Sequence, residues 1–360
     1  MASIQTPSSK RPGTVYPAAP ARKKRPRWGR IALVVIGTIV LIGLVAAGCG
    51  LAYVSSLDGK LHRTNAFSGL DDRPAKSVAG TQNILLLGSD SRDGGAYDPK
   101  AKPNTTTVQN ERSDAIMVLH IPVDHKKAYI VSIPRDTYVS VPELNGHGGV
   151  KAKINAAFAW GGIPLTVMTV EQFTGVKIDH VVKIDFNGFK GMTDALGGVD
   201  VTVDKTVTDP RSHRTFKAGI NHLDGAAALD YVRQRYGLPN SDFDRIHRQQ
   251  IFLRALMQKA ASSGTLSNPV KLKNFLDAAT ESLTVDNSFS LKDMALEFRK
   301  LRAGDISFIT SPHAGSQTID GQSVVVPDRE KALALWTAVE KDQVADWLAG
   351  NTSSNATSGR

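Results

Sequence analysis

Short apolar runs that end at polar or turn-forming residues mark the strands of this chain. Residues 83–87 read NILLL and lead directly into Gly-Ser-Asp, a pattern typical of a strand that is buried on both faces and presents polar groups at its carboxyl end. Two more strands are predicted at 115–123 and 127–133, joined by a tight turn, and Pro134 stops the second. Later strands are predicted at 180–184, 199–203 and 305–310.

Apolar residues that recur every three or four positions predict helices between and after these strands. The helices are expected at 155–160, 164–173, 186–196, 225–231 and 243–261, and further along near 271–279, 291–301 and 328–346. Because strands alternate with helices, the pattern favours an α/β fold in which helices cover both faces of a sheet.

Residues 31–54 form the most apolar stretch and are predicted to be a transmembrane helix. These 24 residues carry no charge, and at about 1.5 Å per residue they can cross a bilayer core of roughly 30 Å. Six basic residues lie between Arg22 and Arg30, whereas the charges just after the stretch nearly balance. The positive-inside rule therefore predicts a single-pass protein of the cell membrane, with a cytoplasmic N-terminus and an extracytoplasmic domain. A cleaved signal peptide is the alternative, but its apolar region spans only about 7 to 15 residues.

Cys49 lies inside this apolar stretch and is the only cysteine. The preceding Val-Ala-Ala-Gly loosely resembles a lipoprotein cleavage site, but Ala46 stands where such a site carries a branched aliphatic residue. We therefore interpret Cys49 as a membrane-buried thiol. A single cysteine allows no intrachain disulfide, so the external domain must be stable through its core alone.

The basic charge of the chain is concentrated at one end. A formal net charge of +10 first suggests nucleic acid as a partner. However, residues 1–30 hold eight of the 44 Lys and Arg residues and no Asp or Glu, so the rest of the chain is nearly neutral. A basic segment beside a membrane helix is explained by topology and by anionic lipid headgroups. We expect a lipid membrane as a partner, and no nucleic acid.

Changes in composition divide the chain into five segments. Residues 1–30 are expected to be a disordered cytoplasmic tail, 31–54 the transmembrane helix, and 55–79 a polar extracytoplasmic stalk. The folded domain is predicted at 80–349, and the polar residues 350–360 are expected to be disordered. The sequence thus predicts one folded domain after one membrane anchor.

Asp and Arg occur together at the ends of several predicted elements, whereas common enzyme motifs are missing. The sequence has no P-loop, GxSxG or HExxH, and its histidines show no metal-ligand spacing. The Asp-Arg combinations occur in GSDSR (88–92), RSD (112–114), PRD (134–136), and YVRQR (231–235) followed by SDFDRIHRQQ (241–250). One such combination alone would be a surface ion pair, but their recurrence at element ends favours a shared site.

The last of these combinations predicts an anion site at a helix start. Arg245, Arg248 and Gln249 are spaced so that they share one helix face, and Ser241 or Asp242 can cap the helix. Cations are disfavoured at a helix N-terminus, so a bound phosphate would account for these arginines. Arg233 and Arg235 lie two apart, and in an extended chain they would point toward the same ligand.

Two carboxylates near these arginines suggest a metal. Asp90 and Asp114 follow and precede adjacent predicted strands, and Mg²⁺ is usually held by one or two carboxylates together with substrate phosphates. Arginines with Mg²⁺ and no obvious nucleophile are typical of phosphoryl transfer, where positioning and charge neutralisation supply most of the catalysis.

The motifs in this order resemble the LytR-CpsA-Psr family of cell-envelope phosphotransferases. The matching segments are NILLLGSDSR (83–92), RSDAIMVLHIP (112–122), VSIPRDTYV (131–139), KINAAFAWGG (153–162), VVKIDFNGFKGMTDALGGVDV (181–201), LDGAAALDYVRQR (223–235) and SDFDRIHRQQ (241–250). The resemblance implies a single α/β/α sandwich with a central mixed sheet. It also implies transfer of a glycopolymer, such as teichoic acid, arabinogalactan or a capsule-like polysaccharide, from a polyprenyl-pyrophosphate carrier to peptidoglycan through a phosphodiester.

The resemblance also implies residue roles. Asp90 and Asp114 would hold Mg²⁺, or Mn²⁺ in its place, and they would act in catalysis with Arg135, Arg235 and Arg245. The pyrophosphate contacts would be Arg92, Arg135, Lys153, Arg233, Arg235, Arg245, Arg248 and Gln249. The general base stays open. The alternatives to transfer are a polyprenyl-pyrophosphate hydrolase or a lipid-phosphate binding protein, and more remotely a transcriptional attenuator.

Overall fold

The computed structural model describes residues 53, 55–89, 113–298 and 301–357 of the chain. The expected cytoplasmic tail and all but one residue of the expected transmembrane helix lie outside these residues, as do Asp90 and Arg92. Within the described ranges, no helix is both long enough and apolar enough to cross a membrane.

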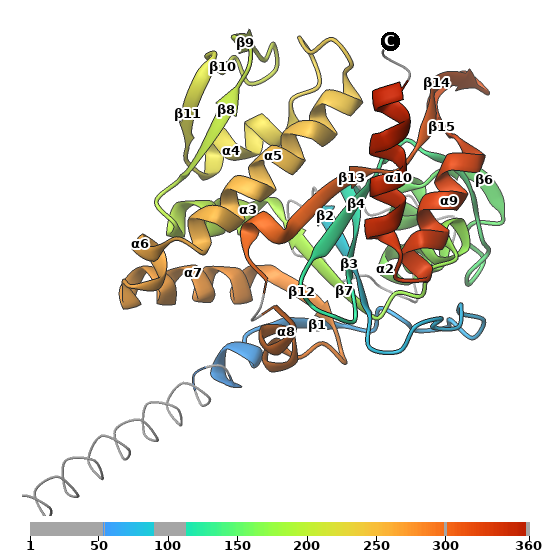
Figure 1. The fold of residues 1–360 in the computed structure, drawn as a ribbon, viewed down its shortest axis with the longest axis horizontal. Coiled ribbons are helices and arrows are strands. Elements are labelled where there is room, and N and C mark those ends of the chain that lie inside the picture. Colours follow the sequence, from blue (N-terminus) through green and yellow to red (C-terminus); the bar gives the residue numbers. More distant parts are fainter. Residues whose placement is uncertain (1–52, 54, 90–112, 299–300, 358–360) are drawn as a thin grey trace, which may run out of the picture. The chain divides into compact units, whose positions relative to one another are not determined.

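The centre of the fold is a seven-stranded sheet with parallel and antiparallel pairs (Figure 1). Its strands, in spatial order, are β1 (His62–Thr64), β12 (Leu283–Asp286), β7 (His180–Asp185), β2 (Gln82–Ser89), β3 (Ser113–Ile121), β4 (Ala128–Ile133) and β13 (Ile306–Thr310). The pairs β1–β12, β7–β2 and β4–β13 are parallel, and the other three are antiparallel. The expected central mixed sheet is confirmed, and β2, β3, β4, β7 and β13 lie where the apolar runs predicted strands.

Alternate residues of β2 face two separate cores, as a strand buried on both faces requires. Leu85 and Leu87 pack with α2 (Asn155–Thr174) and α9 (Arg329–Glu340), whereas Ile84 faces a core that includes residues of α5 (Asp242–Ala260) and α8 (Leu291–Phe298). Figure 1 shows the sheet between these groups of helices. Helices therefore cover both faces, in agreement with an α/β/α arrangement.

A third core lies beside the sheet. It joins β8 (Val199–Val203), β11 (Gly219–Leu223), α3 (Phe186–Ala195), α4 (Gly225–Arg233) and part of α5. The predicted strand at 199–203 exists, but it pairs with β11 in a two-stranded ribbon. The remaining elements are β5 (Tyr138–Val141), β6 (Val150–Lys153), β9 (Val207–Thr208), β10 (Thr215–Phe216), α6 (Ser263–Leu266), α7 (Pro269–Ser282), the 3-10 helix η1 (Ala303–Asp305), β14 (His313–Ile319), β15 (Gln322–Pro327) and α10 (Val344–Thr357).

The helices expected at 155–160 and 164–173 are the two parts of α2, on either side of a kink where Gly161 and Gly162 leave helical geometry. Another helix prediction needs correction. The helix expected at 328–346 is instead two, α9 and α10, separated by a turn in which Asp342 has a φ of 58°. Helix α10 continues through Thr357, into the segment that the sequence was expected to leave disordered.

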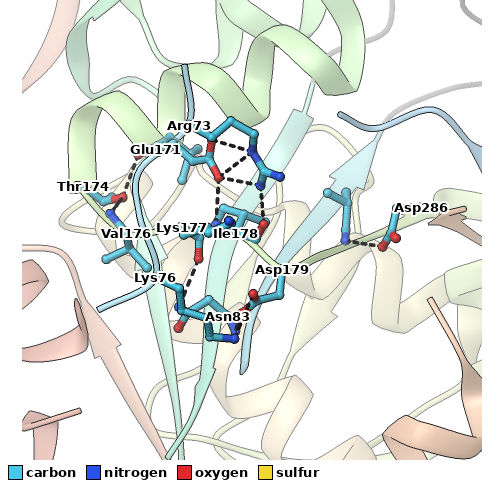
Figure 2. Close-up of polar contacts among 12 residues, drawn as sticks. Arg73, Lys76, Asn83, Glu171, Thr174, Val176, Lys177, Ile178, Asp179 and Asp286 are labelled. Carbon is cyan, nitrogen blue, oxygen red and sulfur yellow. Dashed lines mark hydrogen bonds and ion pairs between the residues drawn. The ribbon is translucent and has the colours of Figure 1, made fainter. Parts of the chain in front are cut away.

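The segment expected to be a stalk is part of the folded domain. Residues 62–64 form the edge strand β1, which pairs with β12. Arg73 Nη2 lies 2.7 Å from Glu171 Oε1, and Lys76 Nζ lies 2.9 Å from Asp179 Oδ1 (Figure 2). Glu171 is 3% exposed and the Arg73 side chain 19%, so the carboxylate of this ion pair is buried and its guanidinium is partly buried. The polar composition of 55–79 favoured a spacer. The partners of Arg73 and Lys76 lie far along the chain, so the local sequence did not indicate these contacts.

Candidate functional site

Charged side chains from five elements meet at one end of the central sheet. We call this group the ionic cluster; its cations are Arg135, Lys153, Arg235 and Arg245, and its carboxylates are Asp114, Asp136 and Asp242. Arg135 and Asp136 directly follow β4, Lys153 ends β6, and Arg235 follows α4. Asp242 and Arg245 occupy the first turn of α5. Among the described residues, the Asp-Arg motifs at 114, 134–136, 231–235 and 241–250 therefore converge in space, each through at least one residue.

Asp136 contacts three cations of the cluster. Its Oδ1 lies 3.6 Å from Lys153 Nζ and 3.8 Å from Arg135 Nε, and its Oδ2 lies 4.0 Å from Arg235 Nη2. Asp136 is 8% exposed. Backbone hydrogen bonds fix the same loop, because the Asn155 N–H donates to the Arg135 carbonyl oxygen over 3.1 Å. Asp136 thus holds together side chains from separate elements.

Asp242 pairs with Arg235 as well, and also with Arg245. Its Oδ1 lies 2.5 Å from Arg235 Nε and 3.4 Å from Arg245 Nη1. Ser241 or Asp242 was expected to cap α5. Ser241 is the N-cap residue, but its side chain forms no hydrogen bond to the helix backbone. The Asp242 carboxylate pairs with the arginines instead. The opposite charge that Asp242 supplies makes it possible to bury Arg245, which is 3% exposed.

The pKa values of the cluster reflect burial and mutual repulsion. Burial, and then the neighbouring carboxyl of Asp242, raise the pKa of Asp136. Burial alone would also raise the pKa of Asp242, but Arg245 and the other nearby charges lower it. Burial lowers the pKa of Arg245 to about 10, and the nearby cations of Arg135 and Arg235 act in the same direction. The guanidinium groups are therefore close enough to disfavour one another's charge.

Two buried guanidinium nitrogens of the cluster lack a hydrogen-bond acceptor. They are the Nε atoms of Arg135 and Arg245, whereas the Nε of Arg235 lies beside Asp242 Oδ1. A buried donor without an acceptor costs free energy, and charged donors cost more than neutral ones. An anion with several oxygen atoms would provide the missing acceptors and offset the repulsion among the arginines. The cluster is therefore a candidate binding site for phosphate or pyrophosphate.

Helix α5 is fixed over the sheet by polar and apolar contacts. Gln250 Nε2 donates to Ser132 Oγ over 3.1 Å and to Thr310 Oγ1 over 3.2 Å, which ties the helix to β4 and β13. Ile246 and Leu256 are buried, as the apolar stripe predicted. Phe243 stacks on His313 with ring centroids 4.0 Å apart. These contacts set the position from which Arg245 enters the cluster.

Some predicted site residues lie outside the ionic cluster. Arg248 donates to Gln234 Oε1, and its guanidinium lies 4.6 Å from the centroid of the Tyr231 ring. Arg233 is exposed, and its guanidinium lies 4.4 Å from the centroid of the Phe186 ring. Arg233 is the last residue of α4 and only Gln234 after it is extended. Arg233 lies over Phe186 while Arg235 joins the ionic cluster, so the expected common direction of these two side chains is not found.

Gln249, the remaining predicted pyrophosphate contact, lies in the first half of α5. Its Nε2 donates to the Val232 carbonyl oxygen over 3.4 Å, so this amide contacts the backbone of α4. Sequence reasoning in turn did not select Asp136 and Asp242 as site residues. Both lie inside the quoted motifs, directly beside Arg135 and Ser241, so the signal was present. Arginines drew attention because they match a phosphate ligand, whereas the carboxylates act by holding the arginines.

Of the two carboxylates expected to hold a metal, only Asp114 is among the residues that the structure describes. Asp114 forms an ion pair with Arg135, while Asp90 lies outside the described residues. Among the residues that the structure describes, no group of three or more His, Cys, Asp and Glu side chains could hold a metal ion. One carboxylate together with substrate phosphate oxygens and water is nevertheless a normal environment for Mg²⁺.

A cavity of about 390 Å³ adjoins the ionic cluster. Arg135, Asp136 and Lys153 line one part of it, and the remainder is lined by residues of β5, β6, α2, β15 and the turn before β15. The cluster therefore has an open approach from the side of these elements.

The fold and the site together define an α/β protein with a cluster of largely buried arginines, which is a candidate site for a multiply charged anion. The chain belongs to the LytR_cpsA_psr family, whose model matches residues 54–341. The resemblance seen in the motifs is thus confirmed.

Relatives with names and solved structures agree with this membership. The chain is 32% identical over 340 residues to the cell wall biosynthesis protein LcpA of Corynebacterium glutamicum, covering 84% of this chain and 64% of LcpA. It is 31% identical to the polyisoprenyl-teichoic acid–peptidoglycan teichoic acid transferase TagU of Enterococcus faecalis, covering 75% of this chain and 84% of TagU. A solved structure of TagT bound to LI-WTA superposes with a TM-score of 0.56 at 27% identity, covering 79% of this chain and 98% of that one.

Proposed function

We propose that this protein is a phosphotransferase that moves a glycopolymer from a polyprenyl-pyrophosphate carrier to peptidoglycan. The observation that carries the proposal is the group of three arginines at a site that is open to a cavity, in which the buried Nε atoms of Arg135 and Arg245 have no acceptor. Family membership and the names of the relatives, LcpA and TagU, give the chemical class. The glycopolymer could be a teichoic acid, arabinogalactan or a capsule-like polysaccharide.

In the proposed reaction the arginines of the ionic cluster bind the oxygens of the pyrophosphate. A hydroxyl oxygen of peptidoglycan attacks the phosphorus that carries the glycopolymer. The bond from this phosphorus to the bridging oxygen then breaks, and polyprenyl phosphate leaves. The arginines neutralise charge on the equatorial and leaving oxygens, which is the main requirement of phosphoryl transfer. Asp136 lines the adjoining cavity and has a raised pKa, so it is suited to accept the hydroxyl proton.

Asp114, together with Asp90, would hold Mg²⁺, or Mn²⁺ in its place. The carboxylate of Asp114 is a hard oxygen ligand beside Arg135, at the edge of the proposed pyrophosphate site. The metal would supply further positive charge for the phosphate oxygens. Binding of Mn²⁺, followed by its electron paramagnetic resonance signal, should weaken in Asp114→Ala without any substrate present.

The proposed location is the outer face of the cell membrane. The support is the uncharged stretch 31–54 after six basic residues, which favours a cytoplasmic N-terminus and an extracytoplasmic catalytic domain. The lipid carrier and the peptidoglycan acceptor would then both be accessible to the ionic cluster.

The test is a transfer assay with the full chain in detergent. The chain is incubated with a short glycan on polyprenyl pyrophosphate, Mg²⁺ and uncrosslinked peptidoglycan, and products are identified by mass spectrometry. We expect a glycan–phosphate–peptidoglycan adduct that is lost in Arg135→Ala and retained in Arg211→Ala, a control outside the ionic cluster whose guanidinium packs on Tyr236. Release of free glycan phosphate alone would indicate a hydrolase, and bound lipid without turnover would indicate a carrier protein.

A further inference from the structure

Several residues of the motif KINAAFAWGG (153–162), and not only Lys153, lie beside the ionic cluster. Besides Lys153, its residues Asn155, Ala156, Ala159 and Trp160 line the cavity beside the ionic cluster. Ala156 and Ala159 have small side chains, so this part of α2 leaves room for a ligand. The backbone N–H of Asn155 is bonded to the Arg135 carbonyl oxygen, which couples the cavity wall to the cluster.

The lining of this cavity combines aromatic rings with polar groups that can donate and accept hydrogen bonds. Trp160 and Tyr138 supply aromatic surface, Asn155 and Gln322 supply amides, and Lys151 and Asp320 supply charges. Sugar rings present apolar C–H faces and a rim of hydroxyl and amide groups, which match aromatic rings and polar side chains respectively. A polyprenyl chain would leave these polar groups without partners, at a cost in free energy. The lining therefore fits a glycan better than a lipid.

A polymer needs more room than one cavity provides. A second cavity, of about 630 Å³, shares Tyr138, Lys151 and Ile319 with the first. It continues past Phe173 and Leu333, and Leu333 is 69% exposed. The two cavities thus form one groove that begins at the ionic cluster and runs between β5 and the β14–β15 hairpin toward α9. A glycan strand can extend along such a groove away from its reacting hydroxyl.

The first cavity of the groove and two of the cluster arginines lie on different elements. Arg235 follows α4, and Arg245 belongs to α5. The described residues that line the first cavity come from the β4–β5 loop, β5, β6, α2 and the β14–β15 hairpin, and none comes from α4 or α5. In phosphoryl transfer the attacking and leaving oxygens lie roughly in line, on opposite sides of phosphorus. If α4 and α5 hold the pyrophosphate and its lipid phosphate, the attacking hydroxyl must approach from the other side.

We infer that this groove binds the acceptor glycan strand of peptidoglycan and that Trp160, Tyr138 and Gln322 are specificity residues for it. This inference rests on the proposed transfer reaction for the identity of its occupant. The glycan of the donor is the other source of the same chemistry, and the experiment distinguishes the two.

The test compares Gln322→Ala with Ser323→Ala in the full chain. Both residues are exposed on β15, but Gln322 lines the groove whereas its neighbour Ser323 lines neither cavity. We expect Gln322→Ala to raise the KM for uncrosslinked peptidoglycan about fivefold to tenfold, as the loss of about one hydrogen bond would, with the KM for the donor unchanged. Ser323→Ala should match the wild type. Trp160→Phe, a second groove variant, should raise the same acceptor KM.

A binding measurement without turnover separates the inference from the proposed function. Soluble peptidoglycan glycan strands are titrated against the full chain, followed by tryptophan fluorescence, without any donor. We expect weaker binding in Gln322→Ala than in Ser323→Ala. Wild-type transfer with an unchanged acceptor KM in both groove variants would overturn the inference and leave the proposed function standing. A raised donor KM would assign the groove to the donor glycan, which also overturns it. Glycan binding without any transfer would instead refute the proposed function.

Discussion

Arg245 and Arg248 are three residues apart in α5, yet their guanidinium groups lie in different environments. Arg245 enters the ionic cluster with Asp242 as its partner. Arg248 is held by Gln234 and lies over the rings of Tyr231 and Phe216, in the third core. Helical spacing placed both residues on one face, and the resemblance assigned both to the pyrophosphate. The structure separates an anion-binding arginine from one that packs with aromatic residues.

The two residues should therefore respond differently to truncation. We expect Arg245→Ala to lower kcat/KM for transfer by about 10²- to 10³-fold, as loss of one charged donor to a transition state does. Its free energy of unfolding should change little, because burial already disfavours the Arg245 charge, and Asp242 keeps Arg235 as a partner. We expect Arg248→Ala to lose about 2 kcal/mol of unfolding free energy through its lost hydrogen bond and ring contacts.

Both variants are compared by transfer kinetics and by urea unfolding. A destabilised Arg245→Ala protein would show that the residue is mainly structural. A stable but inactive Arg248→Ala protein would place Arg248 at the pyrophosphate, contrary to its position in the structure.

The sequence predicted the members of the ionic cluster better than their arrangement. Arg135, Lys153, Arg235 and Arg245 meet as the motifs and the resemblance implied. Arg233 and Arg248 diverge because side-chain direction depends on where α4 ends and on aromatic neighbours that pair only in the folded chain. Spacing along one element could not reveal those partners.

At the scale of elements, the strands that were predicted are those with continuous apolar sequence. Strands β2, β3 and β4 are buried along most of their length, and their composition reports this burial directly. The strands that were missed are short or largely polar; β1 reads HRT, and β12 reads LTVD. Their positions are set by pairing with distant strands, so no local pattern marks them.

The kink in α2 is an element-scale feature that depends on one glycine. Gly162 has φ 61° and ψ −150°, a region that is almost restricted to glycine. We expect Gly162→Ala to destabilise the protein by about 1–3 kcal/mol in urea unfolding, because alanine strains this conformation. Gly191, inside α3, has no atom within 4 Å of an added Cβ. Gly191→Ala is therefore the matched control and should stabilise by up to about 1 kcal/mol. Equal effects of the two substitutions would mean that the kink is not strained by alanine.

Strand β12 is joined to β7 by a buried carboxylate as well as by its ladder. Asp286 is fully buried, and its Oδ2 accepts from the Val181 N–H over 3.0 Å and lies 3.1 Å from His180 Nδ1. Burial alone would raise the pKa of Asp286, but hydrogen bonds from His180, Ser288 and the Val181 N–H lower it to about 2, from an ordinary value of 3.8.

A carboxylate with a lowered pKa in the folded state stabilises the protein above the unfolded pKa, and this stability is lost as the pH falls through the folded pKa. We expect Asp286→Asn to cost about 2 kcal/mol at pH 7, and the difference from the wild type to shrink between about pH 4 and pH 2. Urea unfolding across this range is the measurement, with Asp204→Asn at an exposed turn as the control. A difference that does not vary with pH would mean that the charge of Asp286 contributes nothing.

At the scale of the whole molecule, the folded domain includes residues before position 80, where composition had predicted a stalk. The segment 55–79 contributes an edge strand to the domain, together with ion pairs from Lys60, Arg73 and Lys76. A fragment that begins at residue 80 would lose Arg73 and leave Glu171, which is 3% exposed, without its partner. The Ile178 N–H also donates to Glu171 Oε1 over 2.8 Å, so this carboxylate joins the N-terminal segment, α2 and the chain before β7 (Figure 2).

Arg73→Ala tests this connection in the full chain. Removing one partner of a buried ion pair typically costs about 3–5 kcal/mol, because the remaining charge stays buried without compensation. We expect a loss of this size in urea unfolding, and a smaller loss in Arg73→Ala combined with Glu171→Gln, since the double variant buries no charge at this position. Lys76→Ala is the control, because Lys76 is more exposed than Arg73 and its ion pair with Asp179 should contribute less. Equal losses in the single and double variants would show that Arg73 does not stabilise the protein by compensating the charge of Glu171. The N-terminal segment would then be held by its other contacts.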